Sequence, residues 1–231
     1  MSDVAVITGA TRGIGLATAL AFARRGLSVA LLGHDGPRLA SAADAVTASL
    51  AGGAVARAVA CDVASESDVA RASAEILGVM GAPRVVVNNA GIIRRGALIH
   101  ETRPADWDEV VAVNLRGPFL ISRAFLPAML AANRGRFIHV ASISSTLGSP
   151  GAASYAASKW GLVGFSKSLA EELRGTKLAS IALLPGSVDT DMLTGSGFEP
   201  MMTADDVAAM IVHAALDAPN ALTGSAVEMF G

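Results

Sequence analysis

The chain has 231 residues, of which 52% are apolar and 16% are charged, and its formal net charge is −2. This length is typical of one large domain, and the excess of apolar residues is typical of strands buried on both faces. The slightly acidic charge balance argues against the basic surface of a nucleic-acid-binding protein or of a protein held on anionic lipid.

Cysteine usage and the N-terminal residues indicate the compartment. Cys61 is the single cysteine, so no internal disulfide can form and a reducing compartment is expected. The opening MSDVAVITGA has neither a basic segment nor a long apolar segment of a secretory signal. No apolar run approaches the ~18 residues of a membrane span. We therefore expect a cytoplasmic protein without a membrane segment.

Short apolar, β-branched runs alternate with helical patterns along the whole chain. In parallel α/β proteins such alternation arises from right-handed crossovers, which place helices on both faces of one sheet. The expected fold is α/β, a doubly wound parallel sheet of about seven strands in a single Rossmann-type domain spanning residues 1–231. The predicted strands are Val4–Thr8, Ser28–Leu32, Val55–Cys61, Arg84–Asn88, Arg136–Ala141, Leu178–Leu184 and Ala226–Met229. The predicted helices are Ile14–Arg25, Pro37–Leu50, Glu66–Met80, Pro104–Ala132, Ala152–Arg174 and Thr203–Ala218.

A glycine-rich turn, TGATRGIG, follows the first predicted strand and opens the first helix. Gly9 permits a tight turn, Gly13 allows backbone to approach a pyrophosphate, and Gly15 allows the helix to pack close to the strand. The helix N-terminus then supplies N–H groups and a positive dipole end for phosphates. The strand–turn–helix context therefore predicts a dinucleotide site.

The spacing G-x-x-x-G-x-G resembles that of the short-chain dehydrogenase/reductase family, and further motifs follow in the family's order. NNAG at 88–91 resembles the family's fourth-strand motif, CDV at 61–63 its third-strand end, and PGSVDT at 185–190 the segment beside the nicotinamide. The resemblance runs from about Val4 to the C-terminus. It implies a cofactor site made of Gly9, Thr11, Arg12, Gly13, Ile14, Gly15, Gly33, His34, Asp62, Val63, Asn89, Ala90, Gly91, Tyr155, Lys159, Pro185, Gly186, Val188 and Thr190.

The end of the second strand bears on the choice of cofactor. An acidic residue there would bind the ribose 2′-hydroxyl and repel a 2′-phosphate. Alignment with the family places Gly33 and His34 at this position, and Arg12 where phosphate-preferring relatives often keep a basic residue. These points favour NADP(H) over NAD(H). Asp35 leaves the alternative open, because a shift of one or two residues would let it hold the ribose; it is otherwise a turn residue.

The chain's only tyrosine, Tyr155, lies four residues before Lys159, so the two share one helix face. A free phenol has a pKa near ~10. A neighbouring ammonium stabilises the phenolate and lowers that pKa. We expect Tyr155 to act in this way as a general acid or base, while hydride transfer belongs to the cofactor.

A second hydrogen-bond donor is expected at the end of the fifth strand. Ser142 lies 13 residues before Tyr155, the interval used by the family, and would orient the substrate oxygen. Asn114 matches the family's asparagine, which holds a proton-relaying water. The resemblance thus implies a catalytic set of Asn114, Ser142, Tyr155 and Lys159, with Ser144 lining the pocket. The four histidines are isolated and lack metal-ligand spacing, so no metal site is expected.

The substrate is less constrained by the sequence. GIIRRGAL at 91–98 is similar to gluconate 5-dehydrogenases, and Arg94 and Arg95 could pair with a substrate anion or remain solvated. A short segment, 191–202, stands where relatives carry a longer substrate lid, and Met192 within it is a candidate substrate contact. This short lid suggests an open pocket with broad carbonyl specificity.

The expected function is an NAD(P)-dependent oxidoreductase of EC 1.1.1 type that acts on 3-oxoacyl thioesters or general ketones. A sugar-acid dehydrogenase is the alternative, and a non-catalytic nucleotide-sensing module is the alternative from a different class. The expected partner is a small carbonyl or alcohol substrate, with no nucleic acid and no membrane. The predicted helices 104–132 and 152–174 are suited to contacts within a homodimer or homotetramer.

Overall fold

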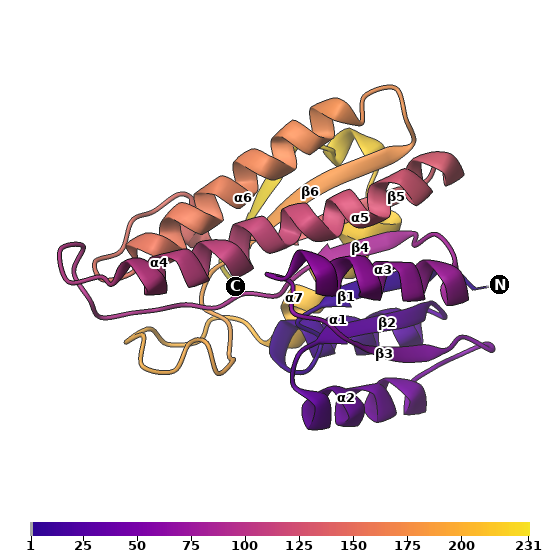
Figure 1. Ribbon diagram of the computed structural model, residues 1–231, viewed down its shortest axis with the longest axis horizontal. Coiled ribbons are helices and arrows are strands. Elements are labelled where there is room, and N and C mark those ends of the chain that lie inside the picture. Colours follow the sequence, from indigo (N-terminus) through magenta and orange to yellow (C-terminus); the bar gives the residue numbers. More distant parts are fainter. Residues whose placement is uncertain (1) are drawn as a thin grey trace.

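The protein is described by a computed structural model, which covers residues 2–231. Its centre is one seven-stranded parallel sheet with the order β3-β2-β1-β4-β5-β6-β7 (Figure 1). The predicted fold class is therefore confirmed. The strands are β1 Val4–Thr8, β2 Ser28–Gly33, β3 Ala56–Ala60, β4 Val85–Asn88, β5 Gly135–Val140, β6 Leu178–Pro185 and β7 Ala226–Met229.

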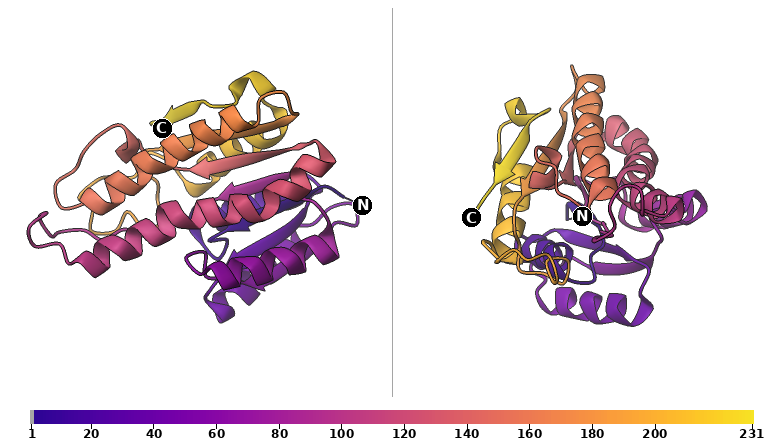
Figure 2. Two further views of the ribbon diagram at one scale, coloured as in Figure 1. Left: turned by 45° about the horizontal axis from the view of Figure 1, so that its top comes forward. Right: turned by 90° about the vertical axis from the view of Figure 1, so that its left-hand side faces the viewer.

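Helices cover both faces of this sheet (Figures 1 and 2). The apolar side chains of β1, β2, β4, β5 and β6 alternate between two cores, one under α1, α2 and α7 and one under α3, α5 and α6. Because both faces are buried, the strands are continuously apolar. The helices are α1 Gly13–Arg24, α2 Gly36–Ala48, α3 Glu66–Met80, α4 Pro104–Val111, α5 Gly117–Ala132, α6 Ala153–Glu172 and α7 Ala204–Val212.

Side chains cap the starts of several helices. The Asp35 carboxylate accepts from the Arg38 N–H at α2, and the Ser65 hydroxyl accepts from the Asp68 N–H at α3. At α7, Thr203 and Asp206 form a reciprocal capping box. Helix α1 differs, because no side chain caps its first N–H groups. Those donors remain available at the carboxyl end of β1.

Two predicted helices contain a change of helical winding. The segment predicted as one helix over 104–132 is α4, a π-helical turn Ala112–Arg116 and then α5. The segment predicted over 203–218 is α7 followed by a π-helical turn His213–Asp217. A π-helical turn inserts an extra residue into the i→i+4 pattern and often occurs at functional sites. Apolar periodicity does not reveal such an insertion.

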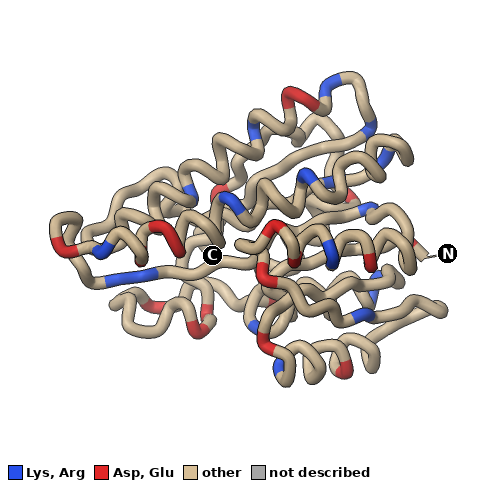
Figure 3. Tube along the Cα trace, viewed as in Figure 1, with Lys and Arg blue, Asp and Glu red and all other residues tan. Residues whose placement is uncertain are grey.

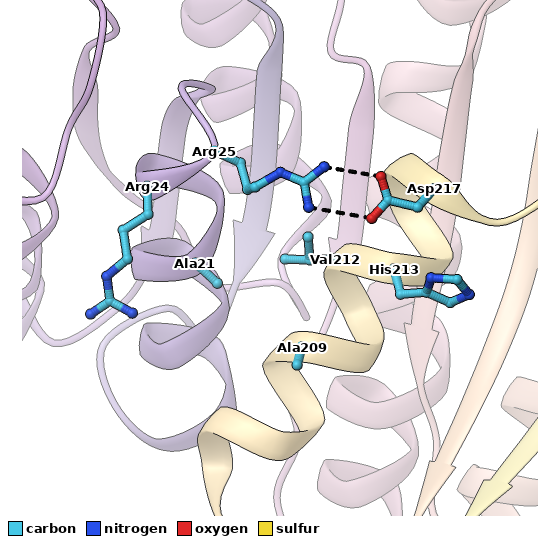
Figure 4. A pocket seen from close by; sticks show the side chains of 7 residues that line it. All are labelled: Ala21, Arg24, Arg25, Ala209, Val212, His213 and Asp217. Carbon is cyan, nitrogen blue, oxygen red and sulfur yellow. Dashed lines mark hydrogen bonds and ion pairs between the residues drawn. The ribbon is translucent and has the colours of Figure 1, made fainter.

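A pocket of about 300 Å³ lies between α1 and α7 (Figure 4). Arg25 and Asp217 meet across it, with Arg25 Nη2 2.9 Å from Asp217 Oδ1. Both side chains are nearly half exposed, so their ion pair contributes little to stability. The pocket lies away from the carboxyl ends of the strands, and the pair connects the end of α1 to the turn that follows α7.

His139 belongs to a buried polar chain within the sheet. Its ring nitrogens bond Asn88 Nδ2 at 3.2 Å and Ser180 Oγ at 3.2 Å. Burial lowers the pKa of His139 to about 3, so the ring is neutral at physiological pH. It is a satisfied core residue. Within residues 2–231, no helix is long and apolar enough to cross a membrane, and no group of three or more His, Cys, Asp or Glu side chains could hold a metal ion.

Candidate active site

The motifs found in the sequence converge on the carboxyl edge of the sheet. The glycine turn follows β1, the NNAG segment follows β4, Ser142 follows β5 and Gly186 follows β6. The order β3-β2-β1-β4-β5-β6-β7 reverses between β1 and β4. In doubly wound sheets, ligands bind outside the strand ends at such a reversal. The fold therefore creates one candidate site from segments far apart in the chain.

The glycine turn leaves no room for side chains. A Cβ on Gly15 would stand 2.2 Å from the Gly9 carbonyl oxygen, and one on Gly9 would stand 2.9 Å from Ala90 Cα. Gly9 and Gly13 also have positive φ angles of 62° and 51°. Together with the uncapped N-terminus of α1, this close packing exposes backbone donors at the edge of the sheet. A pyrophosphate fits such a cradle.

The NNAG segment holds the glycine turn in place. The Thr8 hydroxyl accepts from the N–H groups of Asn89 and Ala90, both at 3.0 Å. The Asn89 amide donates to the Thr8 carbonyl at 2.9 Å and to the Gly9 carbonyl at 3.2 Å. Across the turn, a Cβ on Gly13 would lie 3.2 Å from Thr190 Cγ2. Segments after β1, β4 and β6 are thus assembled around the predicted dinucleotide site.

Other predicted cofactor residues lie at or after the carboxyl ends of β2 and β3. His34 is exposed directly after β2, and Val63 is buried against Gly117. The Asp62 carboxylate accepts from the Ala64 N–H at 2.9 Å. Gly33 ends β2 with Thr11 beside it, since a Cβ there would stand 2.8 Å from Thr11 Cγ2.

The predicted catalytic residues are buried and close to one another. Asn114 is fully buried in the π-helical turn, while Lys159, Tyr155 and Ser142 are 3%, 8% and 8% exposed. The point where a Cβ on Gly91 would stand is 3.4 Å from Asn114 Oδ1 and 3.6 Å from Lys159 Nζ. Lys159 Nζ also lies 5.7 Å from the centroid of the Tyr155 ring.

Asn114 fastens the segment that follows β4. Its Oδ1 accepts from the Ile92 N–H at 2.8 Å, and its Nδ2 donates to the Ile92 carbonyl at 2.9 Å. The same Nδ2 donates to Ser158 Oγ at 3.1 Å. Asn114 therefore links the strand end that carries Gly91 to the helix that carries Tyr155 and Lys159.

The electrostatics of Tyr155 differ from the prediction. Burial raises the pKa of Tyr155, opposed by a hydrogen bond with Ser142 and by the charge of Arg95. The net shift of the Tyr155 pKa is therefore upward, opposite to the expected lowering, because burial outweighs the neighbouring groups that favour the phenolate. Lys159 faces the ring and donates to the Val140 carbonyl at 2.7 Å. Burial also lowers the pKa of Lys159 to about 8, which weakens its hold on the proton.

The two arginines that follow the NNAG segment have different partners. Arg94 donates from Nε and Nη2 to the Glu109 carboxylate, at 2.7 to 3.1 Å, so it is not grouped with the catalytic residues. Arg95 Nη1 donates to the Met192 carbonyl at 2.7 Å, and its charge acts on Tyr155. The sequence analysis missed this role of Arg95, because adjacent arginines are equivalent in a sequence pattern.

The start of the segment 191–202 contacts the candidate site. Met192 Sδ lies 4.0 Å from the Tyr155 hydroxyl, and Asp191 Oδ2 lies 2.6 Å from Arg12 Nη1. Ser144 is placed nearby, since its N–H donates to Ser142 Oγ at 3.1 Å. The base of the segment is closed where Val188 pairs with Met202. Arg12, a predicted cofactor residue, is thus also a contact of the predicted lid.

Comparisons with known proteins agree with this geometry. The family model described as short chain dehydrogenase matches residues 3–198. A 3-oxoacyl-[acyl-carrier-protein] reductase from Synechocystis sp. is 39% identical over 202 residues, covering 87% of this chain and 80% of the relative. The reductase of the same name from Pseudomonas aeruginosa is 34% identical over 241 residues, covering 99% and 96%. A 2-(S)-hydroxypropyl-CoM dehydrogenase from Xanthobacter autotrophicus is 32% identical over 248 residues, covering 100% and 96%.

A nicotinamide dinucleotide is the cofactor that this family and this glycine cradle both indicate. With that cofactor, a phenol and a serine hydroxyl at the same strand edge are suited to carbonyl and alcohol chemistry. The chain therefore belongs to the short-chain dehydrogenase/reductase family and is an NAD(P)-dependent oxidoreductase acting on a carbonyl or secondary alcohol.

Proposed function

We propose that the protein is an NADP(H)-dependent reductase of 3-oxoacyl thioesters and related small ketones. The observation that carries the proposal is the grouping of Tyr155, Ser142 and Lys159 beneath Met192 at the carboxyl edge of β5. The relatives named 3-oxoacyl-[acyl-carrier-protein] reductase support the substrate class, since their similarity covers most of both chains.

A nicotinamide cofactor held at the glycine turn would supply or accept the hydride. Tyr155 donates a proton to the carbonyl oxygen, and its raised pKa keeps the phenol protonated and ready for this step at neutral pH. Ser142, which hydrogen-bonds Tyr155, orients the same oxygen. Lys159 stabilises the phenolate left behind, since its ammonium lies against the ring. Asn114 keeps Gly91 and Ile92 beside Lys159.

The proposed preference for NADP(H) rests on the residues around the end of β2. The Asp35 carboxylate caps α2 through the Arg38 N–H at 3.2 Å and pairs with the Arg38 side chain at 3.3 Å. It is therefore engaged as a helix cap, whereas Gly33 offers no acid to a ribose hydroxyl. The exposed guanidiniums of Arg12, which pairs with Asp191, and of Arg38, which pairs with Asp35, are the cations proposed to bind a 2′-phosphate.

Paired kinetics with NADPH and NADH test this preference. Arg12→Gln is expected to lower kcat/KM for NADPH about tenfold, the loss of one charge-assisted contact, and to leave NADH almost unchanged. Arg24→Gln is the matched control, because Arg24 is exposed at the far end of α1. Equal losses for both cofactors would contradict a 2′-phosphate contact.

Two competing functions receive less support. A sugar-acid dehydrogenase is not favoured, because the relatives reported above are named for oxoacyl and hydroxypropyl compounds and Arg94 is bound to Glu109. A nucleotide-sensing module without catalysis would not need Asn114, Ser142, Tyr155 and Lys159 together. The enzyme is the better account of the site.

The proposal extends to the lid, the assembly and the location. Residues 191–202 are proposed as a short substrate lid, whose exposed Phe198 and Met201 border an open entrance. The exposed Phe119 on α5 and Trp160 on α6 support a homodimer or homotetramer built on these helices. Buried, unpaired Cys61 is consistent with a cytoplasmic location, which cell fractionation would test.

Replacing Tyr155 by Phe tests the catalytic assignment. Turnover of 3-oxoacyl thioesters and small ketones is expected to fall about 100- to 10,000-fold, the usual contribution of a general acid. Cofactor affinity is expected to persist, and unfolding free energy to change by about 1 kcal/mol, since few hydrogen bonds are lost. Unchanged turnover would refute the role of Tyr155. Turnover of none of these substrates by the wild-type protein, with other carbonyls reduced, would refute the substrate class alone.

A further inference from the structure

A cluster of cationic side chains lies at the edge of the sheet opposite the candidate active site. Arg84 immediately precedes β4, Arg136 is near the start of β5, and Lys177 immediately precedes β6. These three strands are neighbours in the sheet. Parallel strands begin at the same edge, so the topology gathers residues separated by about ninety positions. Figure 3 shows cationic residues on this side, which also carries the N-terminus.

These residues line a pocket of about 250 Å³. Arg134 in the turn before β5 adds a fourth cation, and Asn220 and Ala215 complete the wall from the C-terminal part of the chain. The Arg136 N–H donates to the Arg84 carbonyl at 2.9 Å, which places the two cationic residues on adjacent strands side by side. This volume lies at or below the lower end of the range for drug-sized ligands, so the pocket suits a small ligand.

The charges around the pocket are not balanced. Asp3 is the only carboxylate within ion-pair distance of these four cations in residues 2–231, at 2.6 Å from Arg84 and 2.9 Å from Arg134. Neither Arg136 nor Lys177 forms an ion pair in that part of the chain. Burial and the nearby charge of Arg84 lower the pKa of Arg136, and the more distant charge of Asp217 opposes them only in part.

The four cations differ in how they are held. Arg136 donates to the carbonyls of Ala214 and Ala218 at 2.6 and 2.5 Å and to Asn220 Oδ1 at 3.1 Å. These bonds fix its guanidinium against the fold. Arg84 and Arg134 are oriented by the Asp3 carboxylate, which shows that their guanidiniums can share one oxyanion. Lys177 is exposed and can turn toward a ligand.

We propose that this pocket is a second binding site, for a small multivalent oxyanion of the phosphate class. Guanidinium groups match the oxygens of a phosphate in a bidentate manner. Asp3 is one carboxylate paired with two of the four cations. A ligand with two or more negative charges would neutralise the positive charge that remains. The pocket lies at the amino ends of the strands, whereas the candidate active site lies at their carboxyl ends. The proposed anion site is therefore independent of the catalytic function.

Calorimetric titration with pyrophosphate tests this proposal in the NADPH-saturated protein. Saturation keeps the anion out of the cofactor's phosphate site. Sodium chloride holds the ionic strength constant, so that general screening does not imitate binding. The wild-type protein is expected to bind one pyrophosphate per chain, and inorganic phosphate more weakly.

Lys177→Glu is expected to weaken pyrophosphate binding about tenfold or more, as a charge-assisted contact is lost. Lys167→Glu is the matched control, since Lys167 is an exposed lysine on α6 outside the pocket. Asp3→Asn is expected to tighten binding, because it removes the competing carboxylate. Equal weakening by both lysine variants, or binding that Lys177→Glu leaves unchanged, would overturn the proposal. So would the absence of saturable binding in the wild-type protein.

Discussion

Replacing Asn114 by Ala is expected to destabilise the protein and loosen its cofactor site together. The Asn114 side chain makes three hydrogen bonds, two with the backbone of Ile92 and one with Ser158. Asn114 is fully buried, so water cannot easily replace its amide. Truncation therefore removes the connection between the segment after β4 and helix α6.

The magnitude follows from these three bonds. A typical intramolecular hydrogen bond contributes about 1 kcal/mol, and a partner left unpaired in the interior costs more. The expected loss for Asn114→Ala is thus about 3 kcal/mol of unfolding free energy. For a chain of this size, that corresponds to a fall in Tm of roughly 6 to 12 °C. Since Ile92 follows Gly91 directly, the dissociation constant for NADPH is expected to rise as well.

Chemical denaturation and NADPH fluorescence titration measure the two effects. A double-mutant cycle with Ser158→Ala isolates the Asn114–Ser158 bond, with an expected coupling of about 1 kcal/mol. A loss below 1 kcal/mol for Asn114→Ala, with NADPH affinity unchanged, would show that these contacts do not secure the segment.

Three further predictions concern ionisation. The pKa of His139 is about 3 in the fold and about 6.5 in the unfolded chain, so the unfolding free energy falls by about 1.4 kcal/mol per pH unit as the pH decreases from 6.5 toward 3. The unfolding free energy of His139→Gln, measured by denaturation at each pH, should lack this pH dependence. The same pH dependence in both proteins would refute the assignment to His139. Arg95→Leu should raise the pKa of Tyr155, because the charge of Arg95 lowers that pKa. A pH titration followed by phenolate absorbance measures the pKa directly, since Tyr155 is the only tyrosine. Arg94→Leu is the control and should leave the pKa of Tyr155 unchanged. Lys159 should titrate near pH 8 in NMR spectra of the lysine-labelled protein, because burial lowers its pKa from 10.5. The unfolding free energy should rise between pH 8 and 10.5, because in this range only the unfolded chain keeps the Lys159 proton. Titration of Lys159 above pH 10 would contradict the burial argument.

The sequence alone determined the features that depend on local patterns. Continuous apolar runs alternating with helical periodicity were sufficient to predict a doubly wound parallel sheet, because strands covered on both faces have no polar side. The glycine spacing placed a dinucleotide cradle after the first strand. The four-residue spacing of Tyr155 and Lys159 placed both on one helix face. Each of these inferences needed only residues near one another in the chain.

The tertiary structure decided the features that depend on contacts between distant segments. It showed that Arg95 and not Arg94 acts on Tyr155, and that burial raises the pKa of that phenol. It also placed Asn114 in a π-helical turn and gathered the starts of β4, β5 and β6 into one cationic pocket. The packing of the chain decides how deeply a side chain is buried, which charged groups lie near it, and on which side of a loop it lies. No short window of sequence contains the partners that determine them.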